Sequence, residues 1–103
     1  MRRSTRYALL LSFTASLAAC APKLYTPTEI NAQKRGFPLA ELASGRVLYM
    51  NECGECHKLY VPTRYTTEEW TEHLDVMAPK AKINSDQKRL IYQYLVSEVP
   101  VEK

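Results

Sequence analysis

The chain has 103 residues, a length that fits a single domain. Its formal net charge at pH 7 is +3, and three of its cations, Arg2, Arg3 and Arg6, lie at the N-terminus. Removing those three from the 14 Lys and Arg leaves 11, which equals the number of Asp and Glu. Because binding of nucleic-acid phosphates needs a clustered surplus of Lys and Arg, this charge balance argues against a nucleic-acid partner.

The N-terminus has the layout of an export signal. The arginines are followed by a mostly apolar run over residues 7–17, which is too short to span a bilayer comfortably. The run leads into Leu17-Ala18-Ala19-Cys20, which resembles a bacterial lipobox. That resemblance implies a lipoprotein signal peptide over residues 1–19 and a diacylglyceryl group on Cys20. An ordinary secretory signal or a short membrane anchor is the alternative.

A flexible membrane tether is predicted for residues 20–38. The segment contains several prolines and mixed polar residues without a sustained period, with one short helical turn after Thr28. Ala21 follows the predicted lipidation site, and resemblance to lipoproteins implies sorting to the outer membrane, facing the periplasm. The compact domain is then expected over residues 39–103.

The pentapeptide Cys53-Gly54-Glu55-Cys56-His57 predicts a covalently held haem. Two thiols at this spacing reach the two vinyl groups of a haem, and the adjacent histidine then lies beneath the iron as its proximal ligand. A domain this small benefits from a large apolar body in its core. Cys53 and Cys56 are thus the expected attachment points and His57 the expected ligand.

Other uses of the two cysteines are less consistent with the sequence. A thioredoxin-like redox pair needs a βαβ pattern, and a zinc site needs further ligands, but His73 is the only Cys or His after His57. A simple disulfide between Cys53 and Cys56 remains the main competitor. With lipid on Cys20 and haem on the other two, all three cysteines are used.

The first helix is expected from about Leu39 to Asn51, and Gly45 within it indicates close approach by another helix. The connection over residues 58–65 is rich in apolar and aromatic side chains, and its Pro62 carbonyl is a candidate acceptor for the Nδ1 proton of His57.

Two further helices are predicted by their capping signals. Thr66 to Glu69 has the form of a capping box, and Pro79 is expected to end that helix. The last helix is expected from Asn84 or Ser85 to about Glu98, with Tyr94 packing at Gly45.

A second axial ligand is sought among the remaining Met and His residues. Met77 and His73 lie one turn apart on the same helix face, and Met77 is preferred because it lies next to the expected helix end. Trp70 on that face is expected to pack against the haem or screen its edge, although a plain core role fits nearly as well.

From Gly45 to about Leu95 the chain resembles a small monohaem cytochrome c of class I. The resemblance rests on the Gly45-x-x-Leu48-Tyr49 pattern, the haem motif, a downstream methionine and the closing helix. It implies an all-α fold with crossed N- and C-terminal helices around one covalent haem c, and ligation by His57 and Met77. The chain departs from that pattern by lacking a Gly-Pro turn after the motif and by having only nineteen residues between His57 and Met77.

The leading functional hypothesis is a membrane-tethered periplasmic electron carrier that serves redox partner proteins and is not an enzyme. The first alternative is a haem-based gas sensor or peroxidase-like protein with an open or weakly held sixth site. The second is a haem-free structural lipoprotein with a Cys53–Cys56 disulfide.

Overall fold

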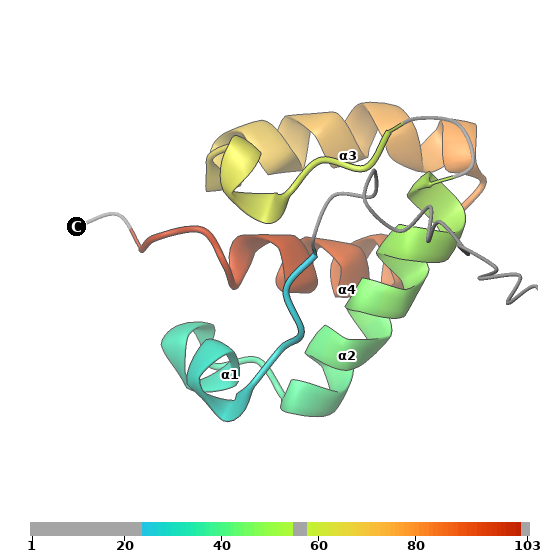
Figure 1. Ribbon diagram of the computed structural model, residues 1–103. Helices are drawn as coiled ribbons and strands as arrows, with labels where there is room; N and C mark the ends of the chain where they lie inside the picture. The colour runs from blue at the N-terminus through green and yellow to red at the C-terminus, as the bar shows by residue number, and fades with distance from the viewer. Residues whose placement is uncertain (1–23, 55–57, 102–103) are drawn as a thin grey trace, which may run out of the picture.

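A computed structural model describes residues 24–54 and 58–101. These residues form α1 (Glu29–Arg35), α2 (Leu39–Leu48), α3 (Thr67–Ala81) and α4 (Ser85–Val96), with a π-helical turn over Tyr49–Cys53 and a 3-10 turn over Pro62–Arg64. No strand occurs within the described ranges, so the all-α prediction is confirmed. In Figure 1, α4 lies at the centre, α3 runs along one side of it, and α2 passes it obliquely. The predicted signal peptide and Cys20 lie outside the described residues.

The helix starts follow their capping signals. Thr66 accepts from the Glu69 N–H at 3.2 Å, and the Glu69 carboxylate accepts from the Thr66 N–H at 3.1 Å. Asn84 and Gln87 make the same reciprocal pair at 2.8 and 2.9 Å. Each pair satisfies N–H groups that a helix start would otherwise leave without partners. Both predicted starts are confirmed.

The prediction that Pro79 ends its helix is wrong. Pro79 lies inside α3, which continues to Ala81. A proline removes one intrahelical hydrogen bond, here the bond to the carbonyl of Asp75, and that residue is exposed, so water can satisfy the carbonyl. The helix ends instead at Lys82, whose φ of 56° is left-handed and whose N–H bonds back to the Ala78 and Pro79 carbonyls.

The close approach predicted at Gly45 is confirmed. A Cβ added at Gly45 would lie 2.1 Å from the Leu90 carbonyl oxygen and 2.9 Å from the Cβ of Tyr94. The backbones of α2 and α4 are therefore in contact at this point. Around it lies the core, which combines buried residues of α4 with Tyr49, Trp70 and Leu74.

The segment before α2 packs on the body of the protein. We call residues 24–35 the N-terminal strap. The Tyr25 ring stacks on Tyr94, with centroids 4.5 Å apart and planes 4° apart. The Tyr25 carbonyl accepts from the Tyr94 hydroxyl at 2.8 Å and from Nε of Arg46 at 3.1 Å, and the Tyr25 hydroxyl donates to the Tyr94 carbonyl.

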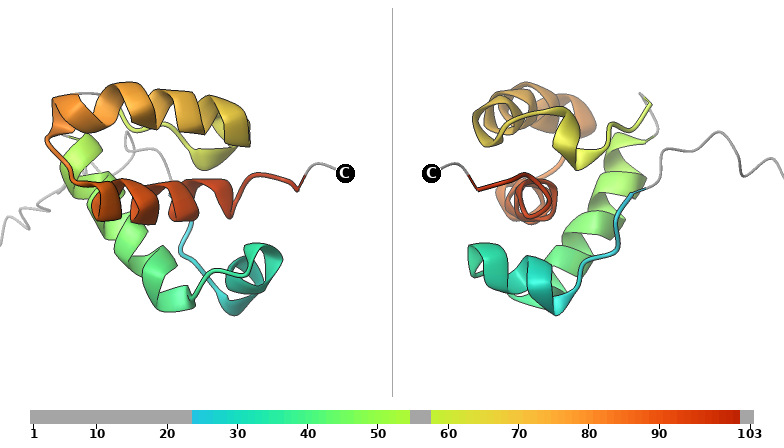
Figure 2. Two further views of the ribbon diagram at one scale, coloured as in Figure 1. Left: turned by 180° about the vertical axis from the view of Figure 1, so that it is seen from behind. Right: turned by 60° about the vertical axis from the view of Figure 1, so that its left-hand side comes forward.

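The strap also reaches the C-terminal end of α4. The Arg35 guanidinium donates to the Val99 carbonyl at 3.1 Å, and α1 itself matches the helical turn expected after Thr28. Among the described residues, packing against the core therefore starts with Leu24. Residues 24–38, which the sequence predicts as part of a tether over 20–38, pack on this body. In Figure 2, α1 lies beside the end of α4 in the view from behind.

Candidate functional site

A pocket of about 260 Å³ opens between the π-helical turn, the 58–65 segment and α3. Its walls are largely apolar and aromatic. The lining residues are Tyr49, Cys53, Lys58, Leu59, Tyr60, Tyr65, Trp70, His73, Leu74 and Met77. Four residues singled out in the sequence, Cys53, Trp70, His73 and Met77, therefore share one pocket. Cys56 and His57 lie outside the described residues.

The two candidate distal ligands differ in their surroundings. Met77 is half-buried, whereas His73 is exposed and packs against Tyr65 with ring centroids 4.2 Å apart. Both are on α3 and both line the pocket, so the predicted sharing of one face is confirmed. Among the described residues, no group of three His, Cys, Asp or Glu side chains could hold a metal ion on its own.

Cys53 is presented by the π-helical turn that follows α2 directly. Turns of this kind are rare and occur frequently at functional sites. Gly54 comes next, and a Cβ at that position would lie 2.6 Å from the Met50 carbonyl oxygen. A side chain at position 54 would therefore displace the turn that carries Cys53. Sequence reasoning did not identify this role, and the glycine between the two cysteines was the available signal.

Tyr49 fixes the chain that returns from the motif. Its hydroxyl donates to the Tyr60 carbonyl at 2.7 Å and accepts from the Tyr60 N–H at 3.1 Å. Burial raises the pKa of Tyr49 above the usual range for tyrosine, although the bond that the hydroxyl accepts from the Tyr60 N–H acts in the opposite direction. The hydroxyl thus stays protonated at neutral pH and keeps both bonds. The Gly45-x-x-Leu48-Tyr49 pattern by itself gives no sign of these two bonds.

Trp70 forms a buried wall of the pocket and is only 4% exposed. Its Nε1–H donates to the Pro62 carbonyl at 2.7 Å, so this carbonyl, the candidate acceptor for His57, already accepts one bond from Trp70. Its ring makes edge contacts with Tyr49 and Tyr65 at centroid distances of 6.2 and 5.0 Å. Trp70 thereby braces the 58–65 segment against α3.

The described residues contain no helix with the length and apolar character needed to cross a bilayer. Comparisons with protein-family models, with curated proteins and with solved structures found no match to this chain.

Proposed function

We propose that this chain carries one haem c, bound through Cys53, Cys56 and His57, and transfers electrons while anchored to a membrane by lipid at Cys20. The observation that carries the proposal is the convergence of Cys53, Met77 and Trp70 on one apolar pocket beside the motif. When bound, a haem supplies an iron that gains and loses one electron without bond chemistry in the protein.

The residues of the pocket fit such a group. Its walls offer aromatic and aliphatic surface, and its sulfur and imidazole side chains are the ligand types that haem iron takes. The volume of about 260 Å³ lies just below the roughly 300–1,000 Å³ typical of ligand sites. A group as large as a haem would fill the pocket and extend past its mouth, which suits electron transfer through an exposed edge.

Met77 is the preferred distal ligand in this proposal. It is half-buried in the pocket wall, whereas the exposed His73 ring packs against Tyr65. A thioether ligand opposite His57 raises the reduction potential relative to a second histidine. Trp70 and Leu74, both 4% exposed, would keep water from this side.

The helix packing at Gly45 supports the resemblance to class I cytochromes c, whose terminal helices cross. The contact of Gly45 with Leu90 and Tyr94 holds α2 against α4, and we take this pair for the crossed helices that the resemblance implies. The partners would be redox proteins of the cell envelope, and the predicted outer-membrane location follows from the lipobox and Ala21 alone.

The test is to mature the full chain in a host that attaches haem, then to record its mass and its oxidised and reduced spectra. The proposal expects the mass of one added haem and a charge-transfer band from methionine sulfur to Fe(III). Met77→Ala should abolish that band, and the matched variant His73→Ala should leave it unchanged. A mature protein without the added mass would end the proposal.

A second candidate is a haem-based gas sensor or peroxidase-like protein with an open sixth site. It is favoured by the continuity of α3 through Pro79, because Met77 then lacks the expected helix end from which its side chain could turn toward a metal. For this candidate the methionine band is absent in the wild type, and the reduced protein binds carbon monoxide without first losing a ligand.

A further inference from the structure

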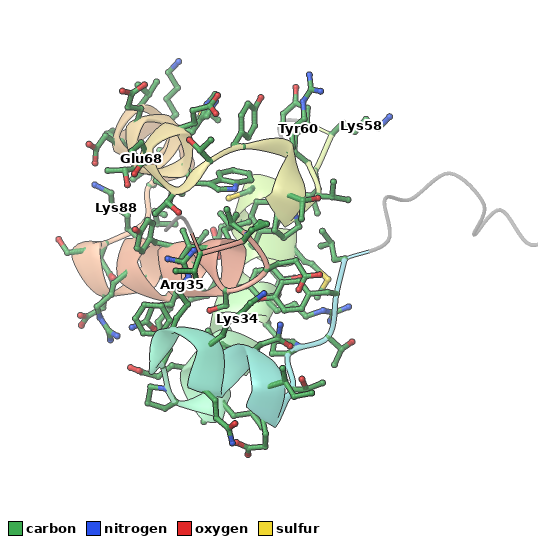
Figure 3. The ribbon with its side chains drawn as sticks, turned by 90° about the vertical axis from the view of Figure 1, so that its left-hand side faces the viewer. Lys34, Arg35, Lys58, Tyr60, Glu68 and Lys88 are labelled. Carbon is green, nitrogen blue, oxygen red and sulfur yellow. The ribbon has the colours of Figure 1, made fainter. Side chains whose placement is uncertain are left out.

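One side of the molecule combines the start of the N-terminal strap with the chain that follows the motif. Figure 3 shows Lys58 and Tyr60 toward the same edge as the beginning of the strap, with Glu68 of α3 toward the other edge. Tyr60 and Val61 are 47% and 38% exposed, and Lys58 is exposed as well. We call Lys58, Tyr60 and the adjacent Val61, together with the start of the strap at the same edge, the strap face.

The distance between this face and a lipid on Cys20 is limited by the length of the intervening chain. Tyr25 is fixed to the body by its stacking on Tyr94 and by the hydrogen bonds of its carbonyl. Cys20 precedes Leu24 by four residues, and four residues span at most about 14 Å when fully extended. If Cys20 carries lipid, as the proposed function holds, Leu24 lies within that distance of the membrane surface.

The side chains of the strap face suit a headgroup layer. Tyrosine places an apolar ring and a polar hydroxyl at a membrane interface, and lysine extends its ammonium toward phosphates. Val61 adds apolar surface, and the exposed Arg64 adds a second cation on the same segment. By contrast, the exposed residues of α3 include Glu68, Glu72 and Asp75, which an anionic lipid surface would repel.

We propose that the strap face lies on the phospholipid headgroups of the membrane to which Cys20 is anchored. The domain is then held against the bilayer and does not swing freely above it. Lys58 and Tyr60 also line the pocket, so the membrane covers that edge. The edge formed by His73 on α3, which is exposed, stays open to a protein partner.

The test measures how fast Lys58 reacts with a water-soluble acylating reagent. Two haem-loaded samples are compared. One is the lipidated protein in vesicles of phosphatidylethanolamine and phosphatidylglycerol, and the other is the Cys20→Ser variant in solution. Lys58 should be acylated severalfold more slowly on vesicles. Lys80, an exposed lysine of α3, is the matched control and should react equally fast in both. Inserting about ten Gly and Ser residues between Lys23 and Leu24 should restore much of the reactivity of Lys58, because the chain between the lipid on Cys20 and the domain is then longer.

The outcomes separate this inference from the proposed function. Suppose that the mass shows the diacylglyceryl group but Lys58 reacts equally fast with and without vesicles. That result overturns the proposal that the strap face lies on the headgroups. Protection of Lys80 in place of Lys58 also overturns it. Such a result would fit a protein partner on this segment. A mass without diacylglyceryl instead overturns the lipid anchor of the proposed function. Protection of Lys58 that survives the spacer overturns the inference as argued, because the short chain between Cys20 and Leu24 is then not what holds the face on the headgroups.

Discussion

Replacing Gly45 with alanine should destabilise the fold, although alanine is the better helix former. The new Cβ would lie 2.1 Å from the Leu90 carbonyl oxygen, 2.8 Å from its carbonyl carbon and 2.9 Å from the Cβ of Tyr94. Leu90 offers only backbone atoms here, which cannot rotate out of the way. Helix α4 would therefore have to retreat by about 1.3 Å to reach the 3.4 Å of an ordinary contact.

The size of the effect follows from two opposing terms. Overpacking costs roughly 1–3 kcal/mol and occasionally more, and the upper end applies because α4 carries the core residues Ile91, Tyr94 and Leu95. Alanine recovers about 1 kcal/mol of helix propensity. The net loss should be about 2 kcal/mol, which lowers the melting temperature of a domain of this size by roughly 8–16 °C.

Thermal unfolding followed by circular dichroism measures this loss on the haem-loaded protein. Ala43→Gly is the control, since Ala43 is exposed on the same helix and reports propensity alone, at a cost of about 1 kcal/mol. A Gly45→Ala variant at least as stable as the wild type would refute the contact between α2 and α4.

Three further outcomes follow from the buried polar contacts. Tyr49→Phe should cost about 1–2 kcal/mol in urea unfolding, because both backbone groups of Tyr60 lose their partner, and an unchanged stability would contradict this. Trp70→Phe should cost about 2 kcal/mol by the same assay through the lost bond to Pro62 and the smaller ring, whereas a loss well below 1 kcal/mol would count against the bracing role. Burial raises the pKa of Tyr94 to about 12. The stability that this neutral hydroxyl contributes is therefore present below pH 10 and is lost between pH 10 and 12. Urea unfolding and tyrosinate absorbance across that range measure the loss, and a stability that does not change with pH there would refute the prediction.

The helices and their contacts were predictable where a local signal determines them. The capping residues Thr66 and Asn84 satisfy N–H groups within one turn, so their effect depends on nearby residues alone. Gly45 also carried information, because a glycine inside an amphipathic helix is costly unless a neighbour needs the space. The sharing of one face by His73 and Met77 follows from their helical spacing.

The rest depended on contacts that the sequence does not display. Whether Pro79 ends a helix depends on whether the Asp75 carbonyl can find water, which is a matter of exposure. The strap is fixed largely through the backbone carbonyl of Tyr25, a group that every residue has. The π-helical turn over Tyr49–Cys53 left a single trace in the residue types, the glycine at position 54 that follows it. Cys56 and His57 lie outside the described residues, so their roles stay predictions.

The series of ring contacts through the core turns the protein into its own optical reporter. Trp70 is the only tryptophan in the chain, and Tyr49, which lies edge-on to it at 6.2 Å, lies 6.2 Å from Tyr94 in turn. Ultraviolet light absorbed by these tyrosines should pass to the indole, so the folded chain should emit almost entirely as tryptophan. Tyrosine fluorescence should emerge only when the rings separate. A haem in the adjoining pocket would quench the fluorescence of the indole. Intrinsic fluorescence would therefore report both unfolding and cofactor loading on untagged protein.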